Sequence, residues 1–250
     1  MPPKISVVLP VLNGENYLRK ALESILNQDY GDYEILVGIN PSSDSTVAIA
    51  KSVLGSKYPG IIKYKDLASM PRNFNRTSAN AVGKYIKFLC HDDELHPNAL
   101  RLLINEFEQN SSSVLVSSYE SFIGEEKAPR GPKSFGSKLR VGRIHSLYRF
   151  SKYGNWLGGP SGVAVRSDLF RRTLFDENLS CAFDLDCWIR LSRLGNISIV
   201  PKELYYSRLH INQGTHFCAE GGFLKDMVSI RRKYLNCSDP ILKMTFRIFS

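Results

Sequence analysis

The sequence lacks both of the glycine-rich motifs by which many α/β domains hold phosphate. No Gly-x-Gly-x-x-Gly motif follows the first strand-like run, which argues against a dinucleotide-dependent oxidoreductase. No glycine-rich loop ends in Gly-Lys-Ser or Gly-Lys-Thr, so we do not expect a P-loop nucleotide site either. Any phosphate-containing ligand must therefore be held by other groups.

Paired cysteines and long apolar segments are also absent. The five cysteines show no Cys-x-x-Cys pair and stand at Cys90, Cys181, Cys187, Cys218 and Cys237. Their odd number and wide spacing predict reduced thiols and a cytoplasmic location. The first apolar run ends at Pro10 and is too short for a secretion signal or a membrane span. We therefore expect any membrane contact to be peripheral, on the inner face of the membrane.

Positive charge predominates, since 33 Lys and Arg face 24 Asp and Glu and the net charge is +9. This balance suits an anionic partner such as a nucleotide diphosphate, an anionic membrane surface or nucleic acid. No nucleic-acid-reading motif accompanies the charge, so we expect no nucleic-acid partner. The length of 250 residues and the hydrophobic content of 43% suit one large α/β domain.

Strand-like and helix-like runs alternate over the first 120 residues. Strands are predicted at 5–10, 33–39, 61–64 and 84–89, and helices at 15–28, 46–56 and 73–82. This alternation with short links predicts a Rossmann-like, doubly wound and mostly parallel sheet.

The second half of the chain is less regular. Residues 120–157 carry many Gly, Pro and basic residues, which predict loops with at most short strands. Strands are predicted at 197–200 and 204–209, and a helix at 222–235. Residues 241–249 mix bulky apolar residues with cations, which suits either a peripheral membrane contact or a helix packed on the core.

Two adjacent carboxylates, Asp92 and Asp93, follow the strand predicted at 84–89. In an open α/β sheet, ligands bind beyond the carboxyl ends of the strands. A divalent cation that also binds diphosphate would relieve the repulsion between the two charges. Alternatively, Asp93 caps the helix predicted to begin near Pro97 and Asp92 is solvated. The local motif leaves both interpretations open.

Four segments in this order resemble glycosyltransferase family 2, namely residues 6–14, 22–28, 40–46 and the run from 83 into Asp92 and Asp93. A weaker resemblance continues from Asp184 to His210. The resemblance implies an α/β protein of the GT-A fold, with an irregular acceptor-side region and C-terminal helices. It also implies an inverting enzyme that uses Mn or Mg and a nucleotide-diphospho-sugar donor.

The resemblance further implies a glycan or lipid-linked acceptor, in the synthesis of cell-surface polysaccharide or glycolipid. The Gln-x-x-Arg-Trp signature of processive synthases is absent, which favours transfer of a single sugar. We expect one domain, with a nucleotide-sugar-binding half at 1–120, an acceptor and catalytic half at 121–221 and a helical tail at 222–250.

Residue by residue, the resemblance implies a nucleotide pocket formed by Pro10, Leu12, Asn13, Asn40, Asn75, Arg76 and Asp92. Asn40 stands where the family usually has an Asp that accepts a hydrogen bond from the base, and an Asn carbonyl still accepts such a bond. Arg76 is expected to meet phosphate. The implied metal ligands are Asp92, Asp93 and His210, although His210 has an ordinary structural role as its alternative.

Asp184 matches the catalytic base of the family, ahead of a helix that contains Trp188 and Arg190. Inverting transfer needs a base because the acceptor hydroxyl loses its proton on the face opposite the leaving diphosphate. The alternatives are that Asp184 caps the helix and that Asp186 is the base.

A glycine-rich turn beside an aromatic residue predicts an acceptor site formed by Trp156, Gly159, Pro160 and Ser161. An ordinary tight loop with Trp156 in the core is the alternative. Ile39, Cys90 and Phe183 replace acids that are common in the family. These losses keep open a second function, that of a non-catalytic nucleotide-sugar-binding protein.

Overall fold

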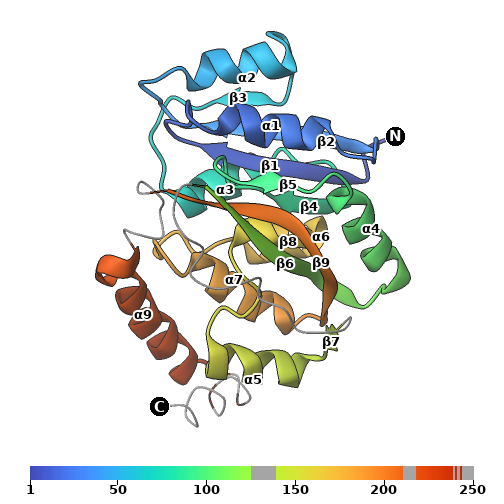
Figure 1. Ribbon diagram of the computed structural model, residues 1–250. Coiled ribbons are helices and arrows are strands. Elements are labelled where there is room, and N and C mark those ends of the chain that lie inside the picture. The colour runs from blue at the N-terminus through green and yellow to red at the C-terminus, as the bar shows by residue number, and fades with distance from the viewer. Residues whose placement is uncertain (125–138, 211–217, 239, 241–242, 244–250) are drawn as a thin grey trace.

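The computed structural model describes residues 1–124, 139–210, 218–238, 240 and 243 (Figure 1). Its strands are β1 (Ile5–Val11), β2 (Tyr33–Ile39), β3 (Ile61–Lys63), β4 (Tyr85–Phe88), β5 (Glu94–Leu95), β6 (Ser113–Gly124), β7 (Leu139–Val141), β8 (Val163–Arg166) and β9 (Asn196–Leu209). Its α-helices are α1 (Leu18–Leu26), α2 (Thr46–Leu54), α3 (Met70–Ser78), α4 (Ala99–Gln109), α5 (Arg143–Tyr153), α6 (Ser167–Thr173), α7 (Phe183–Ser192) and α9 (Phe223–Leu235). Two short helical segments are η1 (Pro160–Gly162), a 3-10 turn, and η2 (Cys218–Gly222), a π-helical turn.

Within the described residues, the strands form one mixed sheet of order β3-β2-β1-β4-β8-β6-β9-β5, and β7 pairs with β9. β1 is parallel to both β2 and β4, and β2 is parallel to β3. The antiparallel strand β8 joins this first half to β6, which is parallel to β9. The predicted α/β fold with a doubly wound first half is confirmed.

Helices cover both faces of the sheet. In β1, Ile5 and Val7 belong to the core beneath α1 and α4, whereas Val8 belongs to the core that α3, α5 and α7 cover. The alternation follows from the two-residue period of a strand. Figure 1 shows α1 and α2 on one side of the strands and α5, α7 and α9 on the other. A strand buried on both faces explains the unbroken apolar run with which the chain begins.

The prediction that residues 120–157 form loops with at most short strands is wrong for the described part. β6 continues to Gly124, and α5 is a helix of 11 residues. Leu147 and Phe150 lie one turn apart on α5 and are buried in the core, which stabilises the helix despite its basic composition. Gly154 ends the helix with a φ of 66°, a conformation that favours glycine. Residues 125–138 lie outside the described part.

The strands predicted at 197–200 and 204–209 are one strand, β9, that continues through Pro201. β6 crosses the boundary that we expected at residue 120 and pairs with β9 along its length. The division into a nucleotide half, an acceptor half and a tail stays a prediction.

Two cysteines contradict the expectation of five reduced thiols. Cys181 and Cys218 form a disulfide, with their Cα atoms 5.5 Å apart. They are separated by 37 residues in the sequence, so no spacing motif marks them, and only the fold brings them together. Cys90, Cys187 and Cys237 are not disulfide-bonded.

The C-terminal helix α9 is close to the predicted 222–235 and packs against the core through Ile230 and Tyr234. The segment 241–249, for which we predicted a membrane or core contact, lies outside the described residues except for Lys243. Among the helices that the structure describes, none is both long and apolar enough to cross a membrane.

Candidate active site

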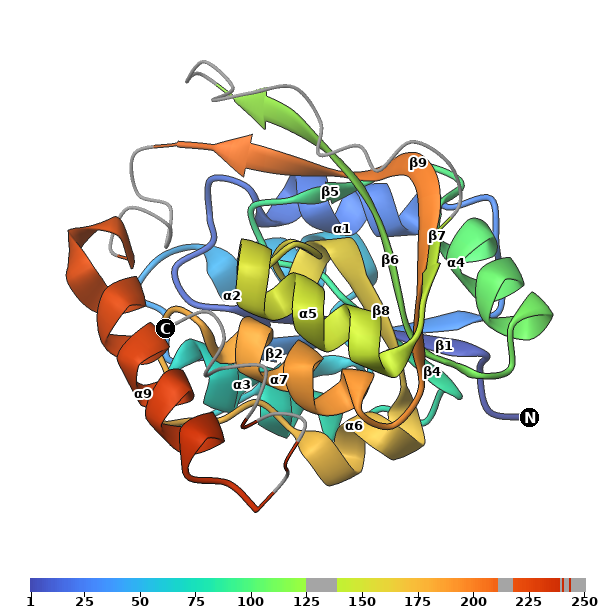
Figure 2. The same ribbon diagram turned by 90° about the horizontal axis from the view of Figure 1, so that it is seen from below.

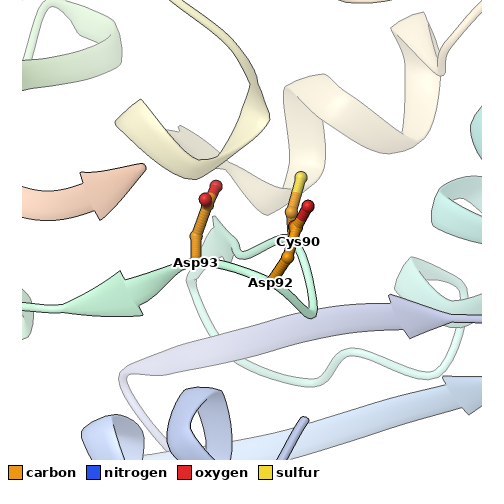
Figure 3. Close-up of side chains that lie close together, drawn as sticks. All are labelled: Cys90, Asp92 and Asp93. Atoms are coloured by element: carbon orange, nitrogen blue, oxygen red, sulfur yellow. The ribbon is translucent and has the colours of Figure 1, made fainter. Parts of the chain in front are cut away.

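The turn after β4 carries the two carboxylates that the sequence singled out. β4 lies beside β1, and the turn closes where the Asp93 N–H donates to the Cys90 carbonyl at 3.2 Å. Figure 3 shows the side chains of Cys90, Asp92 and Asp93 on the same side of this turn. The Cys90 sulfur and one carboxylate oxygen from each aspartate all lie within 4.8 Å of one another. The site therefore stands beyond the carboxyl ends of parallel strands, as expected for this architecture.

Asp93 is the buried member of the pair. Its Oδ1 accepts a hydrogen bond of 3.0 Å from the Arg208 N–H. Burial, together with the charge of Asp92, raises the pKa of Asp93 well above its usual value, although hydrogen bonds from Ser161 and Arg208 oppose the shift. The residue at the N-cap of α4 is Asn98, so Asp93 does not cap that helix. The Asp93 carboxylate is thus hydrogen-bonded to the backbone of β9.

Arg208 of β9 holds the same turn from a second side. Its Nε donates to the Asp92 carbonyl oxygen at 3.0 Å, and its guanidinium pairs with Glu94. Two residues later, His210 Nε2 lies 3.1 Å from Asp92 Oδ2, and the Tyr17 ring lies 4.7 Å from the imidazole ring. The structure therefore brings Asp92 and His210 together, although 118 residues separate them in the sequence.

Cys90 occupies the position where the related family commonly has an acid. Burial and the charges of Asp93 and Asp92 raise the pKa of its thiol well above the usual value. A protonated thiol is a poor ligand for the hard cations Mn and Mg. Cys90 therefore fits a space-filling role in the turn better than a ligand role.

The loops after β1 and β2 are joined at the same edge of the sheet. Asn13 has a φ of 50°, accepts from the Ser43 N–H at 3.0 Å and donates its own N–H to Ser42 Oγ at 3.1 Å. Pro10 is buried within β1, and the Leu12 side chain is 40% exposed at the loop. Asn13 is thus a bridge between the two loops, with Leu12 beside it on the surface.

Asn40 and Arg76 belong to one network. The Asn40 amide exchanges hydrogen bonds with the Ala68 backbone, at 2.9 Å from Nδ2 and 3.3 Å to Oδ1, and Oδ1 also accepts from Arg76. The Arg76 guanidinium lies 3.6 Å above the Tyr64 ring and pairs with Asp66 at 3.2 Å. A nucleotide base that hydrogen-bonds to Asn40 must therefore compete with the Arg76 guanidinium for Asn40 Oδ1.

The side chain of Asn75, the neighbour of Arg76, is hydrogen-bonded to a different segment. Its amide donates to the Phe175 carbonyl and accepts from the Phe175 N–H, both at 2.9 Å, and it also donates to Glu177 at 3.0 Å. Asn75 thus ties α3 to the segment that leads to α7. Its predicted contact with the nucleotide stays a prediction.

Asp184 lies in the first turn of α7. Its carboxylate accepts from Asn155 Nδ2 at 2.8 Å and from the Leu185 N–H at 2.7 Å. The N-cap residue of α7 is Ala182, so Asp184 does not have the capping role that we kept as an alternative. These hydrogen bonds restrain the carboxylate of a residue that is 8% exposed.

Asp186, the second candidate base, is fully buried. It accepts from Arg190 at 2.7 Å, from Lys233 at 2.9 Å and from the Tyr234 hydroxyl at 2.8 Å. Burial and the nearby Asp186 charge raise the pKa of Tyr234. A carboxylate with three protein partners and no exposed surface is poorly placed to take a proton from an acceptor, which favours Asp184.

The loop from 154 to 162 connects the Asp184 side chain with the turn after β4. Asn155 holds Asp184, and six residues later Ser161 Oγ accepts from the Cys90 N–H at 2.9 Å. The Ser161 carbonyl accepts from Lys87, a buried lysine of β4 whose pKa burial lowers to about 7. This one loop therefore contacts both the Asp184 carboxylate and the turn that carries Asp92 and Asp93.

Of the predicted acceptor residues, Trp156 lies in the core, with its ring centroid 5.5 Å from that of Phe150. The alternative interpretation of a tight loop thus describes Trp156 better than a sugar-stacking role. Pro160 and Ser161 are buried in η1, whereas Gly159 is partly exposed just before it. Gly162 must remain small because a Cβ there would come within 2.9 Å of the Tyr205 ring.

Sequence reasoning missed Asn155, Lys87 and Tyr205. Lys87 carried a signal, since a charged residue within a strand buried on both faces needs a polar partner. Its ammonium lies 5.8 Å from the centroid of Tyr205, and burial and the charge of Glu120 raise the pKa of that tyrosine. Asn155 carried no signal, because its role depends on the position of α7.

Sequence comparisons place the chain beside bacterial proteins. The family model described as Glycosyl transferase family 2 matches residues 6–179. An uncharacterised glycosyltransferase from Rickettsia prowazekii is 31% identical over 221 residues, which are 86% of this chain and 66% of that protein. An uncharacterised Mycobacterium tuberculosis protein is 31% identical over 233 residues, 82% of this chain and 67% of that protein. The chain spans about two thirds of the length of these relatives.

A third relative has a named activity. The poly(ribitol-phosphate) beta-N-acetylglucosaminyltransferase TarP of Staphylococcus aureus is 32% identical over 150 residues, 56% of this chain and 43% of TarP. Among solved structures, S. aureus TarS in complex with UDP superposes with a TM-score of 0.77 at 19% identity, over 98% of this chain and 70% of that one. TarS in complex with UDP-GlcNAc also gives 0.77. This likeness shows that the two chains share a fold.

Proposed function

The chain belongs to glycosyltransferase family 2, and we propose that it transfers one sugar from a nucleotide-diphosphate donor to an acceptor hydroxyl, with inversion at the anomeric carbon. The observation that carries this proposal is the loop from 154 to 162. It bonds to Asp184 through Asn155 and to the turn of Asp92 and Asp93 through Ser161. A proton acceptor and a diphosphate site are thereby fixed relative to one another, as displacement in a single step requires.

Asp184 is the proposed base. Displacement at the anomeric carbon needs a carboxylate on the face opposite the leaving diphosphate, within hydrogen-bond reach of the attacking oxygen. The bonds from Asn155 and Leu185 restrict the rotation of the Asp184 side chain, so the carboxylate is already oriented when the acceptor arrives. This arrangement lowers the entropy that the reaction must lose at the transition state.

A divalent cation fits the donor set of the proposed diphosphate site. Asp92 is part of the turn and His210 directly follows β9, and Asp92 Oδ2 lies 3.1 Å from His210 Nε2, so both side chains can face one ion. Asp93, whose carboxylate is bonded to Arg208 and Ser161, stands beside Asp92 in the same turn and is the proposed third ligand. When bound, Mn or Mg would stabilise the negative charge that grows on the leaving diphosphate.

We propose a UDP-sugar as donor, with UDP-GlcNAc as the first candidate. The support is that TarS binds UDP and UDP-GlcNAc and that TarP is an N-acetylglucosaminyltransferase. Asn40, with Leu12 and Asn13 nearby, is the proposed contact of the nucleotide base. On donor binding, the Arg76 guanidinium would give up its hydrogen bond to Asn40 and bind a donor phosphate instead. The proposed acceptor is a hydroxyl of a surface glycan or lipid-linked glycan.

The second candidate function is nucleotide-sugar binding without turnover. Its support is that Ile39 and Phe183 are buried apolar residues where related proteins commonly carry acids. Phe183 belongs to an aromatic cluster, with its ring centroid 5.1 Å from that of Phe175. Asp184 distinguishes the two functions, because a binding protein needs no oriented base.

Calorimetric titration tests the donor site. UDP, GDP and dTDP are titrated into the protein with Mn and then with a chelator present. The proposal predicts that UDP binds with Mn and loses most of its affinity with the chelator. Equal binding in both conditions would remove the metal from the site, and no binding of any nucleotide would overturn the donor assignment.

A further inference from the structure

The helix α9 carries a buried acid whose partners are all in the backbone that precedes α7. The Asp226 side chain is 3% exposed. Its Oδ2 accepts hydrogen bonds from the N–H groups of Ser180 at 2.8 Å, Cys181 at 2.6 Å and Ala182 at 3.0 Å. Three backbone donors on one carboxylate oxygen form a fixed anion site.

These three N–H groups belong to Ala182, the N-cap residue of α7, and to the two residues before it. The first N–H groups of a helix have no partner within the helix, and the helix dipole makes that end positive. α7 has no side-chain cap of its own. Asp226 accepts from the N-cap residue and from the two residues before it, and so holds the backbone that leads into α7 from 44 residues away.

Asp184 follows Ala182 by two positions, so the backbone that Asp226 holds leads directly to the proposed base. α9 also contacts α7 on the C-terminal side of Asp184, where Lys233 and Tyr234 donate hydrogen bonds to the Asp186 carboxylate. Figures 1 and 2 both show α9 beside α7. The turn that carries Asp184 is thus bonded to α9 on both sides.

The disulfide adds a covalent link in the same place. Cys181 is one of the three residues whose N–H groups Asp226 accepts, and Cys218 is in η2, directly before α9. A hydrogen-bonded carboxylate and a disulfide therefore restrain one short backbone segment.

We propose that Asp226 is a positioning residue for the transfer reaction, and that it sets the orientation of the Asp184 carboxylate through residues 180–182. The inference rests on the proposed role of Asp184 as the base. A displacement of a catalytic group by 1 Å can lower a rate about 100-fold. Loss of the Asp226 charge is therefore expected to lower kcat while donor binding persists, because the proposed donor residues stand on α3 and on the segments after β1, β2, β4 and β9, none of which Asp226 contacts.

Steady-state release of UDP from UDP-GlcNAc, with Mn present and water as the acceptor, tests the inference. Asp226→Asn is expected to lower kcat by about 10- to 100-fold and to leave KM within about twofold of wild type. Asp226→Glu keeps the charge but is one methylene longer, so its kcat should lie between those of wild type and Asp226→Asn and at least about threefold below wild type. Lys225→Ala, at the exposed neighbouring position on α9, is the control and should leave both constants unchanged.

The Asp184→Asn variant distinguishes failure of the proposed function from failure of the Asp226 positioning role alone. If Asp184→Asn retains the wild-type kcat, or if the wild type releases no UDP, the proposed function fails and the positioning role fails with it. If Asp184→Asn is inactive while Asp226→Asn keeps the wild-type kcat, only the positioning role is overturned. Should Asp226→Asn not fold, Asp226→Glu decides, and a wild-type kcat for that variant would overturn the inference.

Discussion

Asp186 and Asp184 stand two residues apart on α7, and substitution of Asp186 tests whether their roles are assigned correctly. Asp186→Asn removes a fully buried charge that accepts from Arg190, Lys233 and Tyr234. An asparagine has one acceptor oxygen and turns its own N–H groups toward donors. We expect the folded state to lose most of this network, while the reaction itself is not touched.

The size of the loss follows from the burial of the partners. Removing one member of a buried ion pair costs about 3–5 kcal/mol. The side chains of Arg190 and Lys233 are 22% and 39% exposed, so water compensates part of their loss, and the lower end of the range applies. A cost of about 3 kcal/mol corresponds to a fall in Tm of about 6–12 °C for a chain of this size.

Thermal unfolding followed by circular dichroism measures the stability, and UDP release at 20 °C measures the activity of the folded variant. Asp168→Asn, on the exposed start of α6, is the control and should shift the stability by less than about 0.5 kcal/mol. We expect an Asp186→Asn protein that is less stable but active when folded. A stable Asp186→Asn protein without activity would make Asp186 the base and refute the assignment of Asp184.

The other predictions concern the metal site and the disulfide. Asp92→Ala should abolish Mn-dependent binding of UDP, and calorimetry that gives the same affinity for wild type and variant would remove Asp92 from the site. His210→Ala should weaken Mn affinity about 10-fold, within the range seen for groups that support a metal site; an unchanged affinity would leave His210 with only a structural role. Because the Cys181–Cys218 disulfide spans 37 residues, its reduction should cost about 4 kcal/mol by the chain-entropy relation. Unfolding with and without dithiothreitol tests this, and equal stability of both forms would contradict it.

The sequence predicted the first half of the fold because its strands are buried on both faces and read as unbroken apolar runs. β1 and β2 were found on this ground, and the carboxyl end of β4 directed attention to Asp92 and Asp93. The contact between Asp92 and His210 was implied by resemblance alone and is present in the structure at 3.1 Å. These features depend on local patterns or on spacing within a known family.

The features that the sequence did not reveal depend on contacts between distant segments. α5 was mistaken for loops because its basic residues and flanking glycines conceal a short apolar face. The pairing of Cys181 with Cys218 and the bonds that Asp226 makes arise only when α9 packs against the start of α7. Composition carries no record of such packing, since each partner is ordinary in its own segment.

The stereochemistry of donor turnover tests the central claim most directly. Proton NMR recorded during the first minutes of UDP-GlcNAc hydrolysis, with Mn present, identifies the anomer of the released sugar before it equilibrates. UDP-GlcNAc carries the α-linked sugar, so direct displacement assisted by Asp184 predicts release of β-N-acetylglucosamine. Initial release of the α-anomer, or no turnover by the wild type where Asp184→Asn is equally inert, would contradict an inverting transferase.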